Sequence, residues 1–351
     1  MECGDWALSM GNSLAVLAAG AGGSLAANWG LSRLAARLGL CDRPDSGKCE
    51  VRSAKCEVWD PEFDTRHSEF ALSTLKPHSR PMPLSGGAGL LLGVLLAGAL
   101  AASIQNPKPE IQNPGVVIAL SAVAVLGFGL GLWDDLRWKN ATVPGAKLLL
   151  QAAAASGMAL ALACAGVRPA PGGFGLVLAA GYCVCSMNAW NLEDGMDGLT
   201  GSEAAISALG FAGCFALSGN TIPALFALGL VAALAGFLAL NLHPALVFMG
   251  DSGSHLLGAL LAGLAVVLVS SAGFAALPAT VLIIGLPVAD TGWVIIRRLA
   301  NRNRLGAGDR EHFYDILHRR GLSIRQTVLL CSLIQAALVA AGVLWMEGVI
   351  R

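Results

Sequence analysis

Long apolar runs, each about as long as a membrane-crossing helix, alternate with short polar segments along most of this chain. A transmembrane helix needs about 20 predominantly apolar residues. On that criterion the sequence predicts ten spans, over residues 10–31, 86–105, 115–133, 146–166, 173–190, 202–218, 222–241, 254–271, 274–297 and 327–346. Pro278 and Pro287 should kink the ninth span, because proline removes a helical hydrogen-bond donor. The predicted fold class is therefore all-α, a polytopic integral membrane protein with about ten transmembrane helices.

Composition supports this fold class and excludes others. Apolar residues make up 55% of the chain, charged residues make up 13%, and the mean hydropathy is +0.65. The 44 glycines suit close packing of helices in lipid. A formal net charge of zero argues against a nucleic-acid partner. The first residues lack a basic region, so we expect no cleavable signal peptide, and the nine scattered cysteines do not suggest a disulfide framework.

The basic residues predict an orientation in the membrane. With ten spans, alternate connections lie on opposite faces, and only Lys108, Arg168 and Arg351 fall on the face that holds both termini. The other 20 of the 23 Lys and Arg residues lie on or next to the opposite face. By the positive-inside rule that second face is cytoplasmic. We therefore expect a bacterial inner-membrane protein with external termini and an active site that faces the cytoplasm.

The whole chain, 1–351, is predicted to form one transmembrane domain with a cytoplasmic loop insertion at about 42–80. Within this loop the sequence Lys-Cys-Glu-Val occurs at 48–51 and again at 55–58. A second loop repeats Ile-Gln-Asn-Pro at 104–107 and 111–114. Both repeats have a period of seven, and duplication explains the cysteine spacing better than a metal site does, since no CxxC is present.

The most informative polar stretch runs from Asn188 to Thr200 and holds three acids and two asparagines between two apolar runs. An acid costs roughly 2.5–3.5 kcal/mol at the centre of a membrane helix. Asp194 and Asp197 are three residues apart and would share one face of a helical turn. The adjacent glycines would let the backbone approach a ligand. The stretch suits a divalent cation, a phosphate or a nucleotide, and the alternative is an acidic surface loop.

Two other segments place carboxylates on the same face. Asp134 and Asp135 end the third span, and adjacent carboxylates remain ionised only beside a cation or a basic partner. Their functional interpretation is a Mg²⁺ ligand or a general base, and the alternative is a charge pair at a helix end. Asp251 is flanked by glycines that leave it accessible, and Ser252 and Ser254 are candidate caps of the helix that follows. We expect these acids and Asp194 to converge on one metal ion.

Basic residues on this face could contact phosphate. Lys147 begins the fourth span, where it would either meet a phosphate or extend to the membrane interface. Arg310 and His312 lie in a mixed-charge segment that favours ligand binding, whereas Arg297 and Arg298 are better interpreted as membrane anchors.

Taken together, these motifs resemble the polyprenyl-phosphate N-acetylhexosamine-1-phosphate transferase family. The resemblance extends from Pro83 to about Gln326 and includes the ten spans. It depends on the ordered set Asp-Asp, Asn-x-x-Asn-x-x-Asp-Gly-x-Asp-Gly-Leu and Asn-x-x-Pro-Ala-x-x-Phe-x-Gly-Asp-x-Gly. Each motif alone is weak, but the three in this order are specific.

The resemblance implies a role for each matched position. Mg²⁺, with Mn²⁺ as an alternative, would be held by Asp251 with Asp135 and Asn191. Asp134, Asp135, Asp194 and Asp251 would form the catalytic centre, with Asp134 accepting a proton from the lipid phosphate. The implied substrate-binding residues are Lys147, Asn188, Asn191, Gly195, Asp197, Asn241, Phe248, Arg310 and His312. The uridine end would lie against Gly195, Asp197, Asn241 and Phe248, and Lys147 would meet phosphate.

The implied substrates are a UDP-N-acetylhexosamine and undecaprenyl phosphate in a lipid membrane, with UMP as the leaving product. Pentapeptide-transferring members of the family carry three histidines in the last cytoplasmic loop, where this chain has Asp309-Arg-Glu-His312-Phe-Tyr314-Asp315. This difference favours GlcNAc-1-phosphate transfer over phospho-MurNAc-pentapeptide transfer, which stays the alternative. The hexosamine, the glycan pathway and a homodimer all stay open, as does a two-step route with a carboxylate as nucleophile instead of direct transfer.

Two rival classes remain at this point. A transporter would line a permeation route with acids, and Asp290, deep in the ninth apolar run, is the best candidate for one. A non-catalytic lipid-binding scaffold is the other rival, but it would not need acids gathered from three loops.

Overall fold

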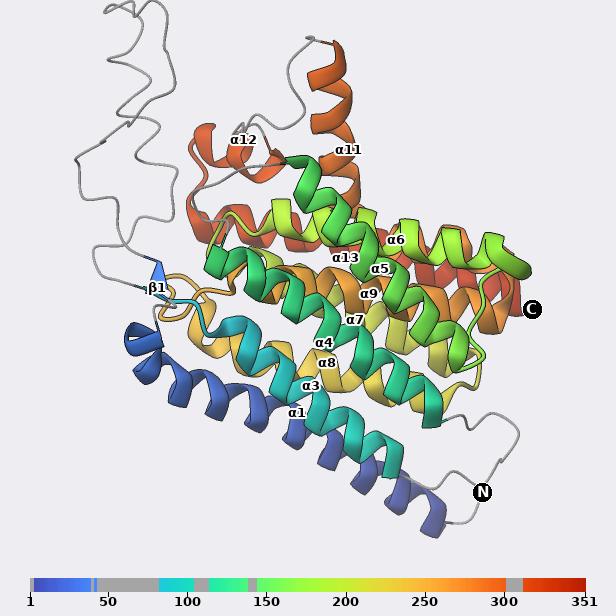
Figure 1. Cartoon of the computed structure of the whole chain (residues 1–351). Coiled ribbons are helices and arrows are strands. Elements are labelled where there is room, and N and C mark those ends of the chain that lie inside the picture. The colour runs from blue at the N-terminus through green and yellow to red at the C-terminus, as the bar shows by residue number, and fades with distance from the viewer. Residues whose placement is uncertain (1–2, 39–40, 43–81, 104–113, 138–143, 301–311) are drawn as a thin grey trace, which may run out of the picture.

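A computed structural model describes residues 3–38, 41–42, 82–103, 114–137, 144–300 and 312–351. The described chain is a bundle of long helices that run side by side, with both chain ends at one end of the bundle and α12 and β1 at the other (Figure 1). The elements in order are α1 (Cys3–Leu38), β1 (Cys41–Asp42), β2 (Met82–Pro83), α3 (Gly86–Ser103), α4 (Pro114–Arg137), α5 (Pro144–Cys164), α6 (Gly172–Glu193), α7 (Leu199–Leu217), α8 (Thr221–Asn241), α9 (Gly250–Ala272), η2 (Phe274–Ala276), α10 (Leu277–Ile283), α11 (Gly285–Ala300), α12 (Phe313–Arg319) and α13 (Ile324–Ile350).

The expected all-α membrane fold is confirmed. Nine helices in the described ranges are long and apolar enough to cross a membrane, and the bent pair Phe274–Ile283 with Gly285–Ala300 makes a tenth crossing if it counts as one. The one departure from all-α structure among these residues is a two-residue antiparallel pair that joins β1 to β2. The insertion beyond Asp42 and the first copy of the Ile-Gln-Asn-Pro repeat lie outside the described residues.

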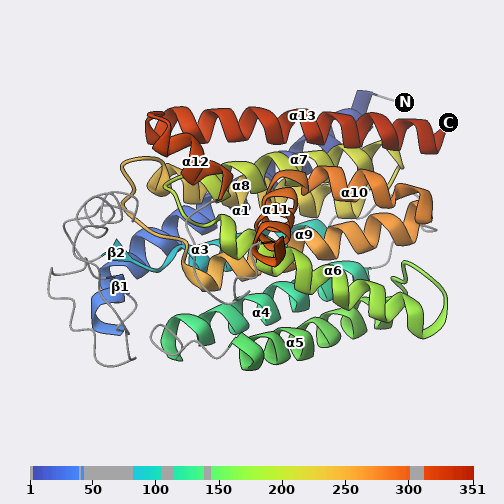
Figure 2. The ribbon, with the colours of Figure 1, turned by 90° about the horizontal axis from the view of Figure 1, so that it is seen from above.

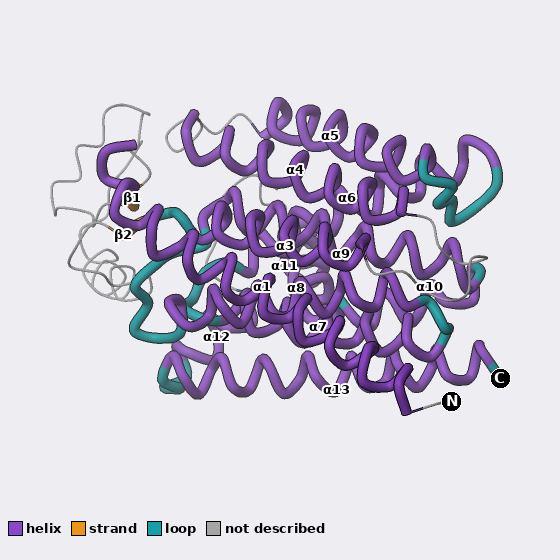
Figure 3. Tube along the Cα trace, turned by 90° about the horizontal axis from the view of Figure 1, so that it is seen from below, coloured by secondary structure: helices purple, strands orange, loops and turns teal. Residues whose placement is uncertain are grey.

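Helix α9 lies near the middle of the bundle, with α4 and α5 on one side and α13 on the other (Figures 2 and 3). Of the predicted spans it is the most enclosed, and 83% of its most apolar window is buried. Glycines let its neighbours approach. Gly131 of α4 lies against the backbone of Asp251, and Gly258 of α9 lies against the backbone of Met187 in α6. In lipid no hydrophobic force drives helices together, so they associate through close contacts of this kind.

The predicted kink in the ninth span is confirmed as a break of 82° between α10 and α11. Pro287 lacks the N–H that would otherwise donate to the carbonyl of Ile283, four residues earlier. Gln335 of α13 fills this gap: its amide nitrogen donates to the Ile283 carbonyl at 2.6 Å, and its amide oxygen accepts from the Leu286 N–H at 3.0 Å. The same amide nitrogen donates to Ser207 of α7 at 2.8 Å. The backbone at the break is thereby satisfied inside the protein, as a membrane interior requires.

Candidate functional site

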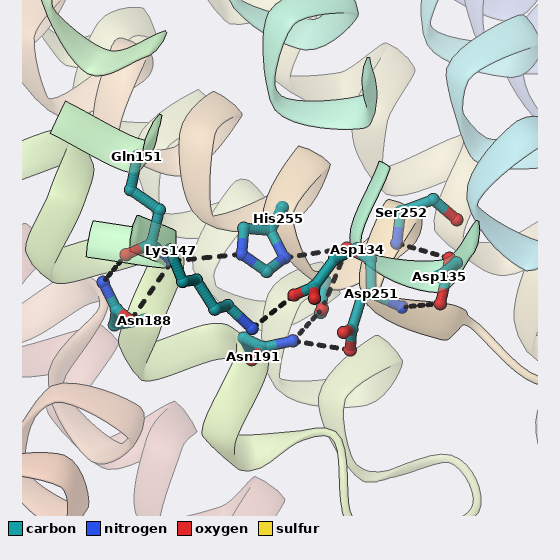
Figure 4. Close-up of polar contacts among 10 residues, drawn as sticks. Asp134, Asp135, Lys147, Gln151, Asn188, Asn191, Asp251, Ser252 and His255 are labelled. Atoms are coloured by element: carbon teal, nitrogen blue, oxygen red, sulfur yellow. Dashed lines mark hydrogen bonds and ion pairs between the residues drawn. The ribbon is translucent and has the colours of Figure 1, made fainter. Parts of the chain in front are cut away.

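The polar residues that the sequence singled out gather at the end of the bundle away from the termini. Figure 4 shows side chains from four helices pointing toward one another there. They are Asp134 and Asp135 of α4, Lys147 of α5, Asn188 and Asn191 of α6, and Asp251 of α9. Residues up to 117 positions apart in sequence are in contact at this point. Asp134, Asp135, Asn191 and Asp251 thus lie together, as expected, whereas Asp194 ends α6 and is not among them. The expected convergence of all these acids on one metal ion is not seen among the described residues.

Asp134 and Lys147 form an ion pair across the α4–α5 boundary. The lysine side chain is 29% exposed and the aspartate side chain 9% exposed, so the pair borders solvent. The Asp251 carboxylate lies close enough to both Asp134 and Asp135 to repel their negative charges. Lys147 thus partly neutralises a cluster of three acids, which leaves the cluster net negative and suited to a further cation.

Asp135 caps the helix that carries Asp251. Its two carboxylate oxygens accept from the backbone N–H groups of Asp251 and Ser252, each at 3.0 Å. A carboxylate at a helix N-terminus satisfies unpaired donors and interacts favourably with the helix dipole. The expected caps, Ser252 and Ser254, do not have this role, because no side chain at the start of α9 caps it from within the helix. This cap fixes the start of α9 to α4.

Asn191 contacts Asp251 directly. Its amide nitrogen donates to one Asp251 carboxylate oxygen at 2.9 Å and to the Ser254 hydroxyl at 3.0 Å. The other Asn191 amide atom, its oxygen, is a neutral ligand of the type that hard cations accept. Asn188, one turn deeper, donates to the Val184 carbonyl at 2.8 Å and exchanges two hydrogen bonds with Gln151. In this structure Asn188 therefore faces its protein neighbours, and its predicted contact with substrate stays a prediction.

The turn after α6 is fastened to the segment that precedes α9. Asp197 contacts the His243 ring at 2.9 Å and accepts from the Ala245 N–H at 3.2 Å. Asn241 accepts from the Gly198 N–H at 3.0 Å and donates to the Val247 carbonyl at 2.8 Å. Gly198 has φ +78, a left-handed conformation that glycine adopts readily. These contacts hold two loops side by side, and they leave the proposed uridine contacts of Asp197 and Asn241 as predictions.

Phe248 is 3% exposed and packs with Met82 and Leu84, next to the start of α3. Backbone hydrogen bonds join the same segment to β2 and α3: Phe248 N–H donates to Pro83, and Gly86 N–H donates to Phe248. Stacking of its ring on a base would require exposure that this arrangement does not provide. The structure instead shows Phe248 in a small apolar cluster, and its predicted role in nucleotide binding stays untested.

The start of α12 is anchored through Asp290 of α11. One Asp290 carboxylate oxygen contacts the His312 Nδ1 atom at 2.5 Å, and the other accepts from the Phe313 N–H at 2.8 Å. Asp290 is 5% exposed and His312 4% exposed. Asp290, the acid that best suited a transporter, is thus paired with a loop residue. Arg310, predicted to bind ligand, lies outside the described residues.

Tyr314 connects α12 to the turn at Asp194 and Gly195. Its ring stacks on that of His312 with centroids 5.6 Å apart, and its hydroxyl donates to the Leu192 carbonyl at 3.3 Å. Burial, with the Asp315 carboxylate nearby, raises the pKa of the Tyr314 phenol well above its ordinary value. The hydroxyl therefore stays protonated and able to donate at any physiological pH. Asp194 itself terminates α6 as its C-cap residue.

Replacing Gly195 with alanine is expected to lower the melting temperature. The added Cβ would lie 2.0 Å from the Tyr314 hydroxyl oxygen and 2.5 Å from the ring carbon that bears it, and this ring is buried. Forcing atoms into such a packed contact costs about 1–3 kcal/mol. Gly181→Ala in α6, where no atom lies within 4 Å of the added Cβ, is the matched control. Adding Tyr314→Leu to Gly195→Ala should recover part of the loss, and equal melting temperatures for the two alanine variants would contradict the docking of α12.

The donors at this site fit Mg²⁺ bound together with phosphates better than a cage of protein ligands. In the part of the chain that the structure describes, no group of three or more His, Cys, Asp and Glu side chains is arranged to hold a metal ion. Asp135 is turned to the start of α9, and Asp194 ends α6. Mg²⁺ commonly takes one or two carboxylates and completes its shell with water and substrate phosphate oxygens. Asp251, Asp134 and the Asn191 amide oxygen provide such a partial set.

Two buried residues next to these donors were missed from the sequence. Gln151 and His255 are 1% and 0% exposed and contact each other at 3.2 Å between side-chain nitrogens. One signal was available: each lies four residues after a predicted site residue, Lys147 or Asp251, and so on the same helix face.

Comparisons with known proteins show what this chain is similar to. Residues 117–269 match the family described as Glycosyl transferase family 4. A Bacillus subtilis protein named "Probable undecaprenyl-phosphate N-acetylglucosaminyl 1-phosphate transferase" is 33% identical over 278 residues, which cover 75% of this chain and 73% of that protein. "Decaprenyl-phosphate N-acetylglucosaminephosphotransferase" of Mycobacterium tuberculosis is 30% identical over 287 residues, 72% of this chain and 69% of the relative. An Escherichia coli protein, "Undecaprenyl-phosphate alpha-N-acetylglucosaminyl 1-phosphate transferase", is 31% identical over 178 residues, about half of each chain.

Proposed function

This chain belongs to glycosyl transferase family 4, and we propose from that premise that it transfers N-acetylhexosamine-1-phosphate from a UDP-sugar to undecaprenyl phosphate. The names of its relatives favour GlcNAc-1-phosphate as the transferred group. One observation carries the proposal: Asp134, Lys147, Asn191 and Asp251, from four helices, meet at one end of an otherwise apolar bundle. An enzyme that transfers a sugar phosphate from a water-soluble nucleotide sugar to a lipid phosphate needs such a polar centre at the membrane boundary.

Both reactants are anionic, so neutralising their charges is the main task of the site. An oxygen of the lipid phosphate attacks the β-phosphorus of the UDP-sugar, a new P–O–P linkage forms, and the bond from that phosphorus to UMP breaks. Lys147, which is paired with Asp134 at the solvent border, would contact phosphate oxygens. The second pKa of a phosphate monoester is about 6, so the attacking oxygen is largely deprotonated near pH 7, and alignment contributes more than a general base does.

The residues present fit a bound Mg²⁺, and Asp251 with Asn191 and a neighbouring carboxylate would hold it. When bound, this ion would supply positive charge that offsets the negative charge developing on the leaving UMP. Asp251 is kept in place by the Asn191 amide, and the start of its helix is capped by Asp135. Asp134 either orients Lys147 or takes the remaining proton of the lipid phosphate.

The site is proposed to face the cytoplasm, where UDP-sugars are made. Most Lys and Arg residues lie in or next to the loops on the same side of the membrane as the site, which the positive-inside rule assigns to the cytoplasm. The two termini lie at the other end of the bundle, which would place them outside the inner membrane (Figure 1). A transporter is less well supported, because the described acids of the site gather at one end and Asp290 is engaged by His312.

Incubating membranes that contain the protein with radiolabelled UDP-GlcNAc, undecaprenyl phosphate and Mg²⁺ tests the proposal. We expect label in the lipid-extractable fraction, one UMP released for each label transferred, and loss of both on adding a chelator. Substrate uptake without UMP release would contradict the proposal and favour transport. The absence of both lipid-extractable label and substrate uptake would also contradict it. UDP-GalNAc and UDP-MurNAc-pentapeptide in parallel reactions identify the hexosamine, since the preferred donor gives the highest kcat/KM.

A further inference from the structure

A second layer of polar residues lies directly beneath the site, one helical turn deeper in the bundle. Gln151 follows Lys147 by four residues on α5, and His255 follows Asp251 by four residues on α9. Asn188 precedes Asn191 by three residues on α6. Residues three or four apart lie on one face of a helix. Each residue of the second layer therefore lies one turn from a site residue on its own helix, and dashed lines join Gln151 to both Asn188 and His255 (Figure 4).

Two backbone carbonyls at the ends of this layer determine the direction of every hydrogen bond in it. At one end the Val184 carbonyl accepts from Asn188, so the Asn188 amide nitrogen points there and its oxygen faces Gln151. Gln151 consequently presents its amide nitrogen to Asn188 at 3.2 Å and to the His255 Nε2 atom at 3.2 Å. At the other end the Asp251 carbonyl lies 2.9 Å from His255 Nδ1, which must carry the ring proton, leaving Nε2 to accept from Gln151.

Gln151 and His255 are fully buried, Asn188 is partly buried, and each of these contacts is satisfied. Gln151 and His255 are 1% and 0% exposed, and neither has an unpaired side-chain atom. Hydrogen bonds in such a low-dielectric setting polarise and stiffen one another, whereas an orphaned buried partner is costly. The network joins the backbone of Asp251 to the helix face of Lys147 without using the side chain of either. It can therefore set their separation without occupying the Lys147 ammonium or the Asp251 carboxylate.

We infer that Gln151, Asn188 and His255 are positioning residues, which hold Lys147 and Asp251 at the separation that phosphoryl transfer requires. This inference rests on the proposed function, because that function gives Lys147 and Asp251 their roles. We call the three residues the positioning layer. Outer partners of this kind orient the residues that touch substrate and metal, and their loss typically lowers activity 10–100-fold.

The test compares His255→Leu, Gln151→Leu and the double variant with Ser186→Ala. Ser186 donates to the Gly258 carbonyl at 2.7 Å in the same α6–α9 interface, is as buried as Gln151 and His255, and takes no part in the hydrogen bonds of the positioning layer. Each single variant removes one buried polar side chain, so similar melting temperatures are expected. The kcat of His255→Leu and of Gln151→Leu should fall about 10–100-fold with the KM for UDP-GlcNAc within about threefold. Ser186→Ala should keep kcat within about twofold, since it lies outside the layer.

The double variant should be no slower than the slower single variant by more than about threefold, because both substitutions break one network. His255→Gln, which keeps a donor and an acceptor, should recover part of kcat. Multiplied losses in the double variant, an equal kcat loss in Ser186→Ala, or wild-type kcat in His255→Leu would each overturn the inference.

A readout independent of turnover separates this inference from the proposed function. The rise in melting temperature on adding UDP with Mg²⁺ should shrink in His255→Leu and not in Ser186→Ala. If wild-type protein forms no lipid-linked product, the proposed function fails, and this thermal shift still decides whether the positioning layer shapes the site. Equal thermal shifts in the two variants would overturn the inference even where wild-type transfer is normal.

Discussion

Asp251→Asn is expected to lower the turnover of purified protein by about 10²–10³-fold. The substitution keeps the size of the side chain, and the new amide oxygen can still accept from Asn191 at the place of the present 2.9 Å contact. Only the negative charge is removed. Because this charge is proposed to bind the cation that neutralises the diphosphate, the loss should appear in kcat and in the Mg²⁺ concentration needed for half-maximal activity.

The control for this prediction is Glu347→Gln. Glu347 forms an exposed ion pair with Arg351 near the chain terminus, at the other end of the bundle. Its loss should leave turnover within about twofold, since exposed pairs contribute little. Initial rates of lipid-linked product formation across a Mg²⁺ titration decide the outcome. Asp251→Asn that keeps more than a tenth of wild-type turnover, with an unchanged Mg²⁺ requirement, would remove Asp251 from the proposed metal site.

Gly131→Ala is expected to have the largest effect of any single methyl addition near the site. The new Cβ would lie 2.0 Å from the Asp251 carbonyl oxygen and 2.5 Å from the Ser252 Cα atom, both of them backbone atoms that cannot rotate away. Relieving this clash must separate α4 from the start of α9, where the Asp135 cap is formed. We expect a stability loss of at least about 1–3 kcal/mol and, because a misplacement of about 1 Å can be sufficient, a fall in turnover of about 10²-fold.

Gly129→Ala provides the comparison, because it lies two residues away on α4 and no atom lies within 4 Å of its added Cβ. Alanine favours a helix over glycine by about 1 kcal/mol, so this variant should melt at or slightly above the wild-type temperature. Melting temperatures and transfer rates of the two variants measured side by side test the prediction. The same behaviour in both would show that the α4–α9 contact does not position Asp251.

The spans and the bend were predictable because each depends on local chemistry. A run of about 20 apolar residues requires a helix in lipid, and Pro287 removes one specific hydrogen bond wherever the helix is placed. The gathering of Asp134, Asn191 and Asp251 was also predictable, since polar groups on one side of a membrane have few places to be satisfied. These inferences need no knowledge of how one helix is rotated against another.

Partners across helices could not be predicted in the same way. Helices that are apolar on every side carry no polar stripe to fix their rotation. The sequence therefore did not show that Asp135 would face the start of α9, that Asp197 would contact His243, or that Gln335 would reach the break at Ile283. The predicted roles of Asp197, Asn241 and Phe248 in binding the uridine came from resemblance. In the structure these residues contact neighbouring loops, and their role in binding uridine stays a prediction.

Because α10 and α11 meet at a break, a change in the angle between them would displace residues farther along α11. Asp290 lies five residues beyond Gly285, about 7.5 Å along the helix axis at 1.5 Å per residue. Its carboxylate contacts the His312 ring and accepts from the Phe313 N–H. A swing of about 10° at the break would therefore carry Asp290 about 1.3 Å, enough to pull both contacts apart. Gln335 restrains the break, because its amide is hydrogen-bonded to the backbone on both sides of it. A side chain of α13, bonded to both sides of the break, thus helps to hold Asp290 where it contacts the start of α12.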